Sequence, residues 1–206
     1  MCRVVTISAS YGAGGSVVAP RVAQRLGLEF ADRLIPASDR PYRDASGEQL
    51  APDERQQLAR GSLLVRLASL GSGFGLPVPE AEDFGDQVRN HVEESIQRIA
   101  RGPGGVILGR AAAIVLGRQR SAFHVRLDGP AERRLAQAVA LEGVDRETAQ
   151  ARQVDTDRAR TRYVSRLYGY DPADPAVYHL VLDSTAIPFD GCVEVIATAA
   201  EAFWNR

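Results

Sequence analysis

The chain opens with a strand, a glycine-rich turn and a helix, and this order restricts its fold more than any other feature. Residues 3–8 form a short β-branched run that is typical of a buried strand. Three glycines follow within residues 12–15, and apolar residues at helical spacing then continue to Gly27. A second short run, residues 28–32, predicts another strand. We therefore expect a right-handed crossover unit of a parallel sheet.

The rest of the chain repeats this alternation. Short apolar runs predict strands at residues 106–108, 122–127 and 178–182. Apolar residues at helical spacing predict helices at residues 82–100, 111–116, 130–142, 146–168 and 192–204. Five strands that alternate with helices predict an α/β three-layer sandwich with a five-stranded parallel sheet.

Residues 33–79 have a looser pattern than either flank. This segment holds one expected helix, residues 52–70, and a glycine-rich stretch, residues 71–77, that indicates a loop. The whole chain has 206 residues, which suits one domain with small inserted lobes. We expect the looser segment to be such a lobe or lid.

The chain contains no lysine, because its 25 lysine and arginine residues are all arginine. This composition excludes Schiff-base lysines, lysine general bases and the lysine of a consensus phosphate loop. The guanidinium group is planar and always charged, and it binds phosphate or carboxylate through two hydrogen bonds. Any strong cationic site in this protein is therefore built from arginine.

Charge and cysteine content narrow the class further. The net charge of −1 does not favour nucleic acid or an acidic membrane as a partner. Cys2 and Cys192 form no motif and suggest a reducing compartment, and no apolar run is long enough for a signal peptide or a spanning helix. The three histidines are scattered, which supports neither a metal cluster nor a Ser-His-Asp triad. We expect a cytoplasmic protein.

The first turn has the composition of an anion site. Its glycines let backbone N–H groups approach an anion, and the helix that starts near Ser16 adds its positive N-terminal dipole. In the consensus phosphate loop, Gly-x-x-x-x-Gly-Lys-Ser/Thr, Ala9 would stand at the first glycine and Gly15 at the lysine. Only Gly14 and the hydroxyl of Ser16 match. The turn is either a phosphate cradle or a strand-to-helix connection that binds nothing.

Arginines are concentrated in the expected helix at residues 146–168, which carries six of them. Helical spacing places four charged residues along one face, namely Asp155, Arg158, Arg162 and Arg166. This helix is either a solvated surface helix held by ion pairs or a mobile lid that brings arginines to transferring phosphates.

Polar residues also follow three of the expected strands, at the edge where open α/β sheets bind ligands. The strand at residues 106–108 runs into Gly109 and Arg110. The position of Arg110 at the end of this strand favours a role in ligand binding. Asp32 is either a ligand for a ribose or metal-bound water, or a helix cap. Residues 183–185, Asp-Ser-Thr, allow the same two interpretations.

Several short motifs occur in a specific order over about three quarters of the chain. They are Thr6-Ile7-Ser8-x-x-Tyr11-Gly12-x-Gly14-Gly15, Leu26-Gly27, Phe30-x-Asp32, Val106-Ile107-Leu108-Gly109-Arg110, Phe123-His124-Val125-Arg126-Leu127, Val154-Asp155-x-x-Arg158-Ala159-Arg160-x-x-Tyr163, Tyr168-Gly169 and Tyr178-x-Leu180-Val181-Leu182. In this order and spacing the chain resembles the cytidylate kinase-like family, relatives of bacterial CMP and dCMP kinases. Residues 41–80 match nothing in that pattern.

The resemblance implies a P-loop NTPase fold of the nucleoside monophosphate kinase type. Residues 1–206 would form one domain, with an inserted monophosphate-binding lobe at residues 33–85 and an arginine-rich lid at residues 145–170. The family's activity is phosphoryl transfer from ATP, with Mg²⁺, to a nucleoside monophosphate, here CMP or dCMP.

The same resemblance assigns roles by position. The donor phosphates would be held by Gly12, Ala13, Gly14, Gly15 and Ser16, and the Ser16 hydroxyl would contact Mg²⁺. Arg110 would hold the acceptor phosphate, with Asp32 and Asp155 near the acceptor. Arg158 and Arg162 would close over the transferring group.

The chain departs from the family pattern around its loop. Family members commonly read Ser-Arg-Glu-Tyr before the glycines and arginine after them, whereas this chain has Ala9, Ser10 and Ser16 at those positions. Phosphoryl transfer depends on positioned positive charge. A second hypothesis is therefore a nucleotide- or phosphate-binding regulatory or interaction protein with impaired catalysis. A third is a kinase of another small acceptor, since specificity would be set in the unmatched lobe.

Overall fold

The computed structural model describes residues 2–31 and 81–206. The strands are β1 (Val4–Ala9), β2 (Phe30–Ala31), β3 (Gly105–Leu108), β4 (Ala122–Asp128) and β5 (Leu180–Asp183). The helices are α1 (Gly15–Leu26), α3 (Ala81–Arg101), α4 (Ala112–Leu116), α5 (Ala131–Glu142), α6 (Arg146–Tyr168), the 3₁₀ turn η1 (Pro175–Val177) and α7 (Phe189–Trp204). Asp32, the expected helix at 52–70 and most of the expected lobe at 33–85 lie outside the described residues.

The five strands form one sheet in the order β2-β3-β1-β4-β5, and every neighbouring pair is parallel. β1 lies at the centre and pairs with β3 on one side and β4 on the other. This arrangement confirms the predicted α/β sandwich with a five-stranded parallel sheet. Strand order changes direction at β1, so the turn that leaves β1 lies where such sheets bind ligands.

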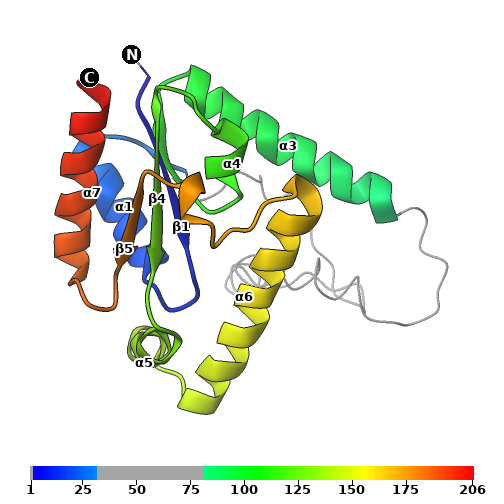
Figure 1. Ribbon diagram of the computed structural model, residues 1–206, viewed down its shortest axis with the longest axis vertical. Coiled ribbons are helices and arrows are strands. Elements are labelled where there is room, and N and C mark those ends of the chain that lie inside the picture. Colours follow the sequence, from blue (N-terminus) through cyan, green and yellow to red (C-terminus); the bar gives the residue numbers. More distant parts are fainter. Residues whose placement is uncertain (1, 32–80) are drawn as a thin grey trace, which may run out of the picture.

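Helices cover both faces of the sheet (Figure 1). On one face, α1 and α7 pack over a core that includes Val5, Ile7 and Val125. On the other face, α3 and α4 pack over a core that includes Val4, Ile96 and Ile107. Both faces of β1 are buried because its alternate side chains enter different cores, which explains its continuous apolar run.

Capping residues explain where two of the helices begin or end. Asp145 caps α6 by accepting a hydrogen bond from the amide of Thr148, and Gly169 ends this helix in a left-handed conformation with φ 68°. These two residues give α6 the same bounds, 146–168, that the sequence predicts. Gly27 ends α1 in the same way, with φ 65°.

Several element boundaries differ from the prediction by one to three residues, and three of these differences have a clear local cause. α4 begins at Ala112, because Arg110 and Ala111 both have positive φ and cannot join the helix. β5 begins at Leu180, because Tyr178 follows a 3₁₀ turn and turns its hydroxyl to the carbonyl oxygen of Pro172. α7 begins three residues early, at Phe189, directly after Pro188.

The carboxyl ends of the parallel strands meet at one edge of the sheet. The turn after β1, the turns after β3 and β4 and the start of α7 lie at this edge, and α6 runs past it (Figure 1). None of the helices in residues 2–31 and 81–206 combines the length and the apolar character that a bilayer crossing requires.

Candidate phosphate-binding site

The turn between β1 and α1 is held in shape by its glycines. Gly12 and Gly14 have φ of 77° and 72°, in the left-handed region that favours glycine. A Cβ on Gly12 would overlap the carbonyl oxygen of Arg134 in α5, and one on Gly14 would overlap the ring of Phe189 in α7. The turn therefore needs these glycines for its packing against two helices, whatever it binds.

Several backbone amides of this turn are open. The amide of Ser10 donates to the carbonyl oxygen of Leu127, and that of Ala13 donates to the carbonyl oxygen of Ser10. Within residues 2–31 and 81–206, four amides at the start of α1 donate no hydrogen bond, those of Gly12, Gly14, Gly15 and Ser16. Unpaired amides at a helix N-terminus are suited to an anion. Four of the five predicted cradle residues thus have an amide without a protein partner, while the amide of Ala13 is already paired with Ser10.

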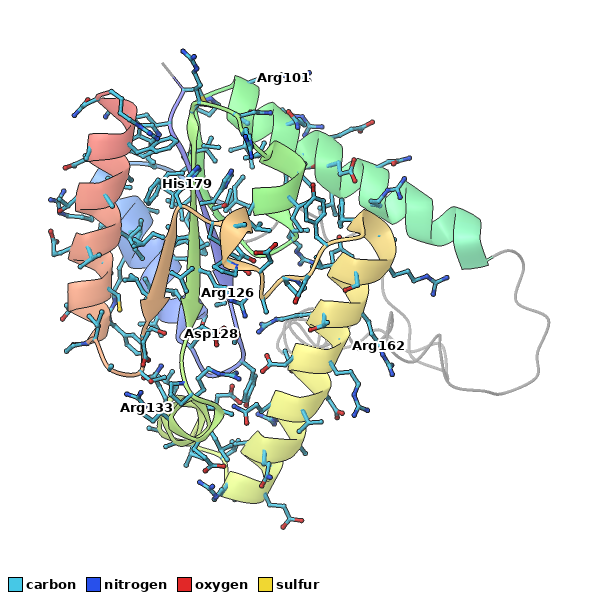
Figure 2. All side chains as sticks on the ribbon, viewed as in Figure 1. Arg101, Arg126, Asp128, Arg133, Arg162 and His179 are labelled. Atoms are coloured by element: carbon cyan, nitrogen blue, oxygen red, sulfur yellow. The ribbon has the colours of Figure 1, made fainter. Side chains whose placement is uncertain are left out.

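Three arginines from three different elements also contact residues of the turn. Arg126 of β4 donates to the hydroxyl of Ser10 at 2.9 Å, and it points from β4 toward α6 (Figure 2). Arg134 of α5 donates to the carbonyl oxygen of Tyr11 at 2.7 Å. Arg160 of α6 donates to the carbonyl oxygen of Ala9 at 2.8 Å. We call these residues the arginine cluster.

Two carboxylates partner the cluster. Arg126 makes two hydrogen bonds to one oxygen of Asp128, at 3.0 and 2.7 Å. Arg134 pairs with Asp157 at 2.8 Å and lies 3.4 Å from Asp128. The amide of Tyr11 also donates to Asp157, at 2.8 Å. α6 is thus tied directly to the backbone of the turn.

Ionisation of these groups follows from their pairing. Burial alone would lower the pKa of Arg126, but its hydrogen bonds to Asp128 and the charge of that carboxylate raise it. Burial works to raise the pKa of Asp128, and the Arg126 contacts outweigh it, so the pKa falls. For Arg160, burial and then the nearby charges of Arg126 and Arg134 lower the pKa, against the attraction of Asp157. Positive charge is therefore in excess beside the turn.

A cavity of about 310 Å³ adjoins the turn between α5 and the start of α7. Gln137 lines it and donates to the carbonyl oxygen of Gly12 at 2.8 Å. Ser184, also in the lining, donates to the carbonyl oxygen of Ala13 at 2.8 Å. The remaining lining residues are Thr185, Ala186, Ile187, Pro188 and Phe189. A ligand that fills this cavity would extend directly from the turn.

Residues 183–185 serve mainly to hold the segment that lines the cavity. Asp183 accepts hydrogen bonds from the amide of Thr185 at 3.0 Å and from its hydroxyl at 2.5 Å. The hydrogen bond from the Thr185 hydroxyl, more than any other contact, lowers the pKa of Asp183. Asp183 therefore caps a turn, and it is not the expected helix cap, because Pro188 is the N-cap of α7.

The other predicted residues lie at different places around the site. Arg110 follows β3 with φ 60°, and its charge acts on Tyr163 of α6. Arg158, Arg162 and Asp155 are exposed on α6. Figure 2 shows Arg162 on the side of α6 that faces away from the sheet. The structure therefore brings Arg110 to the ligand edge and leaves the other three in solvent.

A family model supplies the decisive comparison. The model described as the cytidylate kinase-like family matches residues 4–186. The chain belongs to the cytidylate kinase-like family. The match runs from β1 to the segment after β5, so it contains the turn, the arginine cluster and most of the cavity lining.

Individual proteins are also similar to this chain. A cytidylate kinase from Methanopyrus kandleri is 26% identical over 214 residues, which cover 98% of this chain and 95% of that protein. A uronate isomerase from Corynebacterium glutamicum is 24% identical over 135 residues, 64% of this chain but 26% of that protein. The crystal structure of an uncharacterized protein from Eubacterium ventriosum has a TM-score of 0.66 at 17% identity, with 97% and 99% of the two chains covered. The last likeness supports the fold alone.

The metal that such kinases use has a modest set of protein ligands here. Ser16 is exposed in the first turn of α1, beside the open amides. Among residues 2–31 and 81–206, no three His, Cys, Asp or Glu side chains gather as a metal site. Mg²⁺ commonly keeps several waters and binds through phosphates with one or two protein ligands. The donor set fits an ion held mainly by a bound nucleotide.

Sequence reasoning about this cytidylate kinase-like chain missed the arginine cluster and Asp157. A signal was present in α6, where Ala149, Gln153, Asp157, Arg160 and Val164 recur at helical spacing. The structure buries three of these five residues, Ala149, Gln153 and Val164. This is the inward face of α6, and the charged row at 155, 158 and 162 occupies the outward face. The apolar residues Ala149 and Val164 indicate which face of α6 points inward.

Proposed function

We propose that this protein is a kinase that transfers the γ-phosphoryl group of ATP to a nucleoside monophosphate, with CMP or dCMP as the acceptor. Membership of the cytidylate kinase-like family supports the reaction class. The Methanopyrus kandleri relative, named a cytidylate kinase, supports the acceptor. The observation that carries the proposal is the row of open amides from Gly12 to Ser16 beside the arginine cluster.

The donor nucleotide would bind across the turn and the cavity. Its phosphates would accept hydrogen bonds from the amides of Gly12, Gly14, Gly15 and Ser16, which lack protein partners in the described chain. Its base would enter the 310 Å³ cavity, where Gln137 and the backbone of residues 184–188 offer polar groups among apolar ones. The two sites adjoin, as one nucleotide requires.

The acceptor would bind at the edge next to β3. Arg110 lies in the turn that follows this strand and would hold the acceptor phosphate. Asp32 and Asp155 would lie near the acceptor nucleotide. Arg158 and Arg162 are exposed on the face of α6 that points away from the turn, so the contact with the transferring group that the resemblance implies would require α6 to move.

In phosphoryl transfer the protein positions the two substrates and stabilises charge, and it forms no covalent bond to them. An oxygen of the acceptor phosphate attacks the γ-phosphorus, and the bond from that phosphorus to the β–γ bridging oxygen breaks. Charge develops on the transferred group and on the leaving diphosphate. Arginines and unpaired amides would stabilise that negative charge, because the fold already holds them in position. Mg²⁺, held by the phosphates and Ser16, would add further positive charge.

One specific observation favours a second candidate. Gly15 stands where a consensus phosphate loop has lysine, and the chain has no lysine at all. The alternative is therefore a regulatory or interaction protein that binds nucleotide without transferring phosphate.

A coupled assay for ADP release separates the two candidates. With Mg-ATP we expect turnover with CMP or dCMP above that with UMP, AMP or GMP. The variant Arg110→Gln should raise the KM for the acceptor at least about tenfold, since a charge-assisted contact is lost, while ATP binding stays unchanged. Arg120→Gln removes the same charge at the opposite edge of the sheet and serves as the control. Background turnover with every monophosphate, in protein that binds ATP, would reject the nucleoside monophosphate kinase and agree with the second candidate or with a kinase of another small acceptor.

A further inference from the structure

The lysine position of the turn is closed to side chains. A Cβ on Gly15 would lie 2.7 Å from the Cβ of Ala9 and 3.2 Å from a methyl of Leu108. Gly15 therefore packs against Ala9. A cationic side chain at position 15 would displace the end of β1. Any cation that serves the phosphates has to come from another element.

Arg160 of α6 contacts the residue that lies beside Gly15. Its Nη1 donates to the carbonyl oxygen of Ala9, the residue in contact with Gly15. In the described part of the chain this is the one hydrogen bond that Arg160 makes, although a guanidinium has five N–H donors. Its side chain is 39% exposed, so it stays partly accessible from solvent.

The three arginines of the cluster differ in how well they are paired. Arg126 is bonded to Asp128 at 2.7 Å and Arg134 to Asp157 at 2.8 Å. Arg160 lies 3.9 Å from the nearer oxygen of Asp157, an oxygen that already accepts from the amide of Tyr11. Three guanidinium groups face two carboxylates, and Arg160 carries the charge that is left over. An anion bound at the unpaired amides would neutralise this remaining positive charge.

The rotation of α6 decides which arginine can reach the turn. Successive residues of a helix are 100° apart, so Arg158 and Arg162 each lie about 160° around the helix from Arg160. Asp157 fixes the rotation, because it binds both Arg134 and the amide of Tyr11. While these contacts hold, only Arg160 of the three points to the turn.

We propose that Arg160 binds the donor phosphates in place of the missing loop lysine, so that the cation of the phosphate site is delivered by α6. The assignment rests on the proposed function for the identity of the donor, but not for the binding of a phosphate chain. On binding, Arg160 exchanges the carbonyl oxygen of Ala9 for phosphate oxygens, which are the better acceptors.

Calorimetric titration with inorganic tripolyphosphate tests the assignment without an acceptor or turnover. Arg160→Gln should weaken binding by about 10–100-fold, because a charge-assisted contact is lost. Arg160→Lys should retain more affinity than Arg160→Gln, since the charge remains. Arg120→Gln should change affinity by less than about twofold. Arg120 precedes the amino end of β4, and the length of that strand, about 20 Å, separates it from the turn by more than a Debye length. Unchanged affinity in Arg160→Gln overturns the proposal, as does the same loss on substituting Arg158 or Arg162 instead.

A second measurement uses the wild-type chain and does not depend on the variants folding. Phenylglyoxal modifies accessible arginines, and peptide mass spectrometry reports each site. Saturating tripolyphosphate should slow modification of Arg160 at least about tenfold, as expected for a guanidinium engaged by phosphate. An unchanged modification rate at Arg160 contradicts the assignment. If tripolyphosphate binding depends on Arg160 but no monophosphate is phosphorylated, the kinase proposal fails alone. If the kinase is active while Arg160→Gln binds normally, this inference fails alone.

Discussion

A single residue of the turn can act in two ways, by packing against a neighbouring helix and by offering a group for ligand binding. Gly12 shows the first, because a side chain there meets the backbone of α5. The amide of the same residue shows the second, because it has no partner in the described chain. A mutation at Gly12 therefore mixes both effects, and stability has to be measured before any loss of activity is interpreted.

Gly12→Ala should destabilise the fold strongly. Its φ of 77° alone costs an alanine roughly 1–2 kcal/mol, and the overlap with the carbonyl oxygen of Arg134 adds to this. We expect a total loss of at least about 3 kcal/mol in the free energy of unfolding, measured by urea titration.

Gly27→Ala provides the matched control for this measurement. Gly27 has a similar φ of 65°, and a Cβ there would meet nothing within 4 Å. Its substitution should cost only the strain, about 1 kcal/mol. Equal losses in the two variants would mean that α5 yields to the new methyl group.

At the scale of the element, β4 carries polar residues within an otherwise apolar strand, and each has a defined partner. Arg126 serves the arginine cluster at the carboxyl end of the strand. His124, nearer the amino end, is buried in the strand that lies between β1 and β5. It receives a hydrogen bond from the Thr6 hydroxyl on Nδ1 and donates from Nε2 to the carbonyl oxygen of Gly117. In the neutral ring, the bond that Nε2 donates leaves Nδ1 as the acceptor.

Stability should therefore fall on acidification through His124. Burial, with a smaller contribution from His179, lowers the pKa of His124 from 6.5 to about 4. The unfolded chain takes up the proton below pH 6.5 and the folded chain only near pH 4, so stability is full above 6.5 and declines as the pH falls. Between pH 7.5 and 5 the loss attributable to this residue should be about 2 kcal/mol.

Urea titrations of the wild type and of His124→Gln across that range give the measurement. The variant keeps a donor and an acceptor but does not titrate, so its stability should depend less steeply on pH. Parallel curves for the two proteins would show that His124 does not cause the dependence.

At the scale of the whole molecule, the turn is a junction of elements far apart in sequence. Side chains from β4, α5, α6 and the segment after β5 all bond to residues 9–13. The net charge of the chain is only −1, so attraction of phosphate depends on this local gathering rather than on the overall charge. Ligand binding at the junction should stabilise every element tied to it.

ATP should therefore raise the melting temperature of the whole domain. At a ligand concentration 100 times Kd, binding adds about 2.7 kcal/mol to stability, equivalent to about 5–10 °C for a chain of this size. Differential scanning fluorimetry with adenosine as the control isolates the phosphate contribution. An equal shift with adenosine would place the binding energy in the cavity and not at the turn.

Much of this protein was determined by its sequence alone. Alternating strands and helices, with β-branched runs that only a doubly covered sheet can bury, predicted the parallel α/β sandwich. The strand, glycine turn and helix predicted the place of the open amides. Capping residues Asp145 and Gly169 gave α6 its observed ends.

Only the tertiary structure decided which arginine faces the turn. α6 is charged on most of its surface, and its buried positions are few, Ala149, Gln153 and Val164. With so little apolar surface, the helix's own pattern sets its rotation weakly. The rotation is fixed instead by Asp157, through bonds to Tyr11 and Arg134, residues more than twenty positions away. Contacts between distant segments thus turn Arg160 inward and leave Arg158 and Arg162 in solvent.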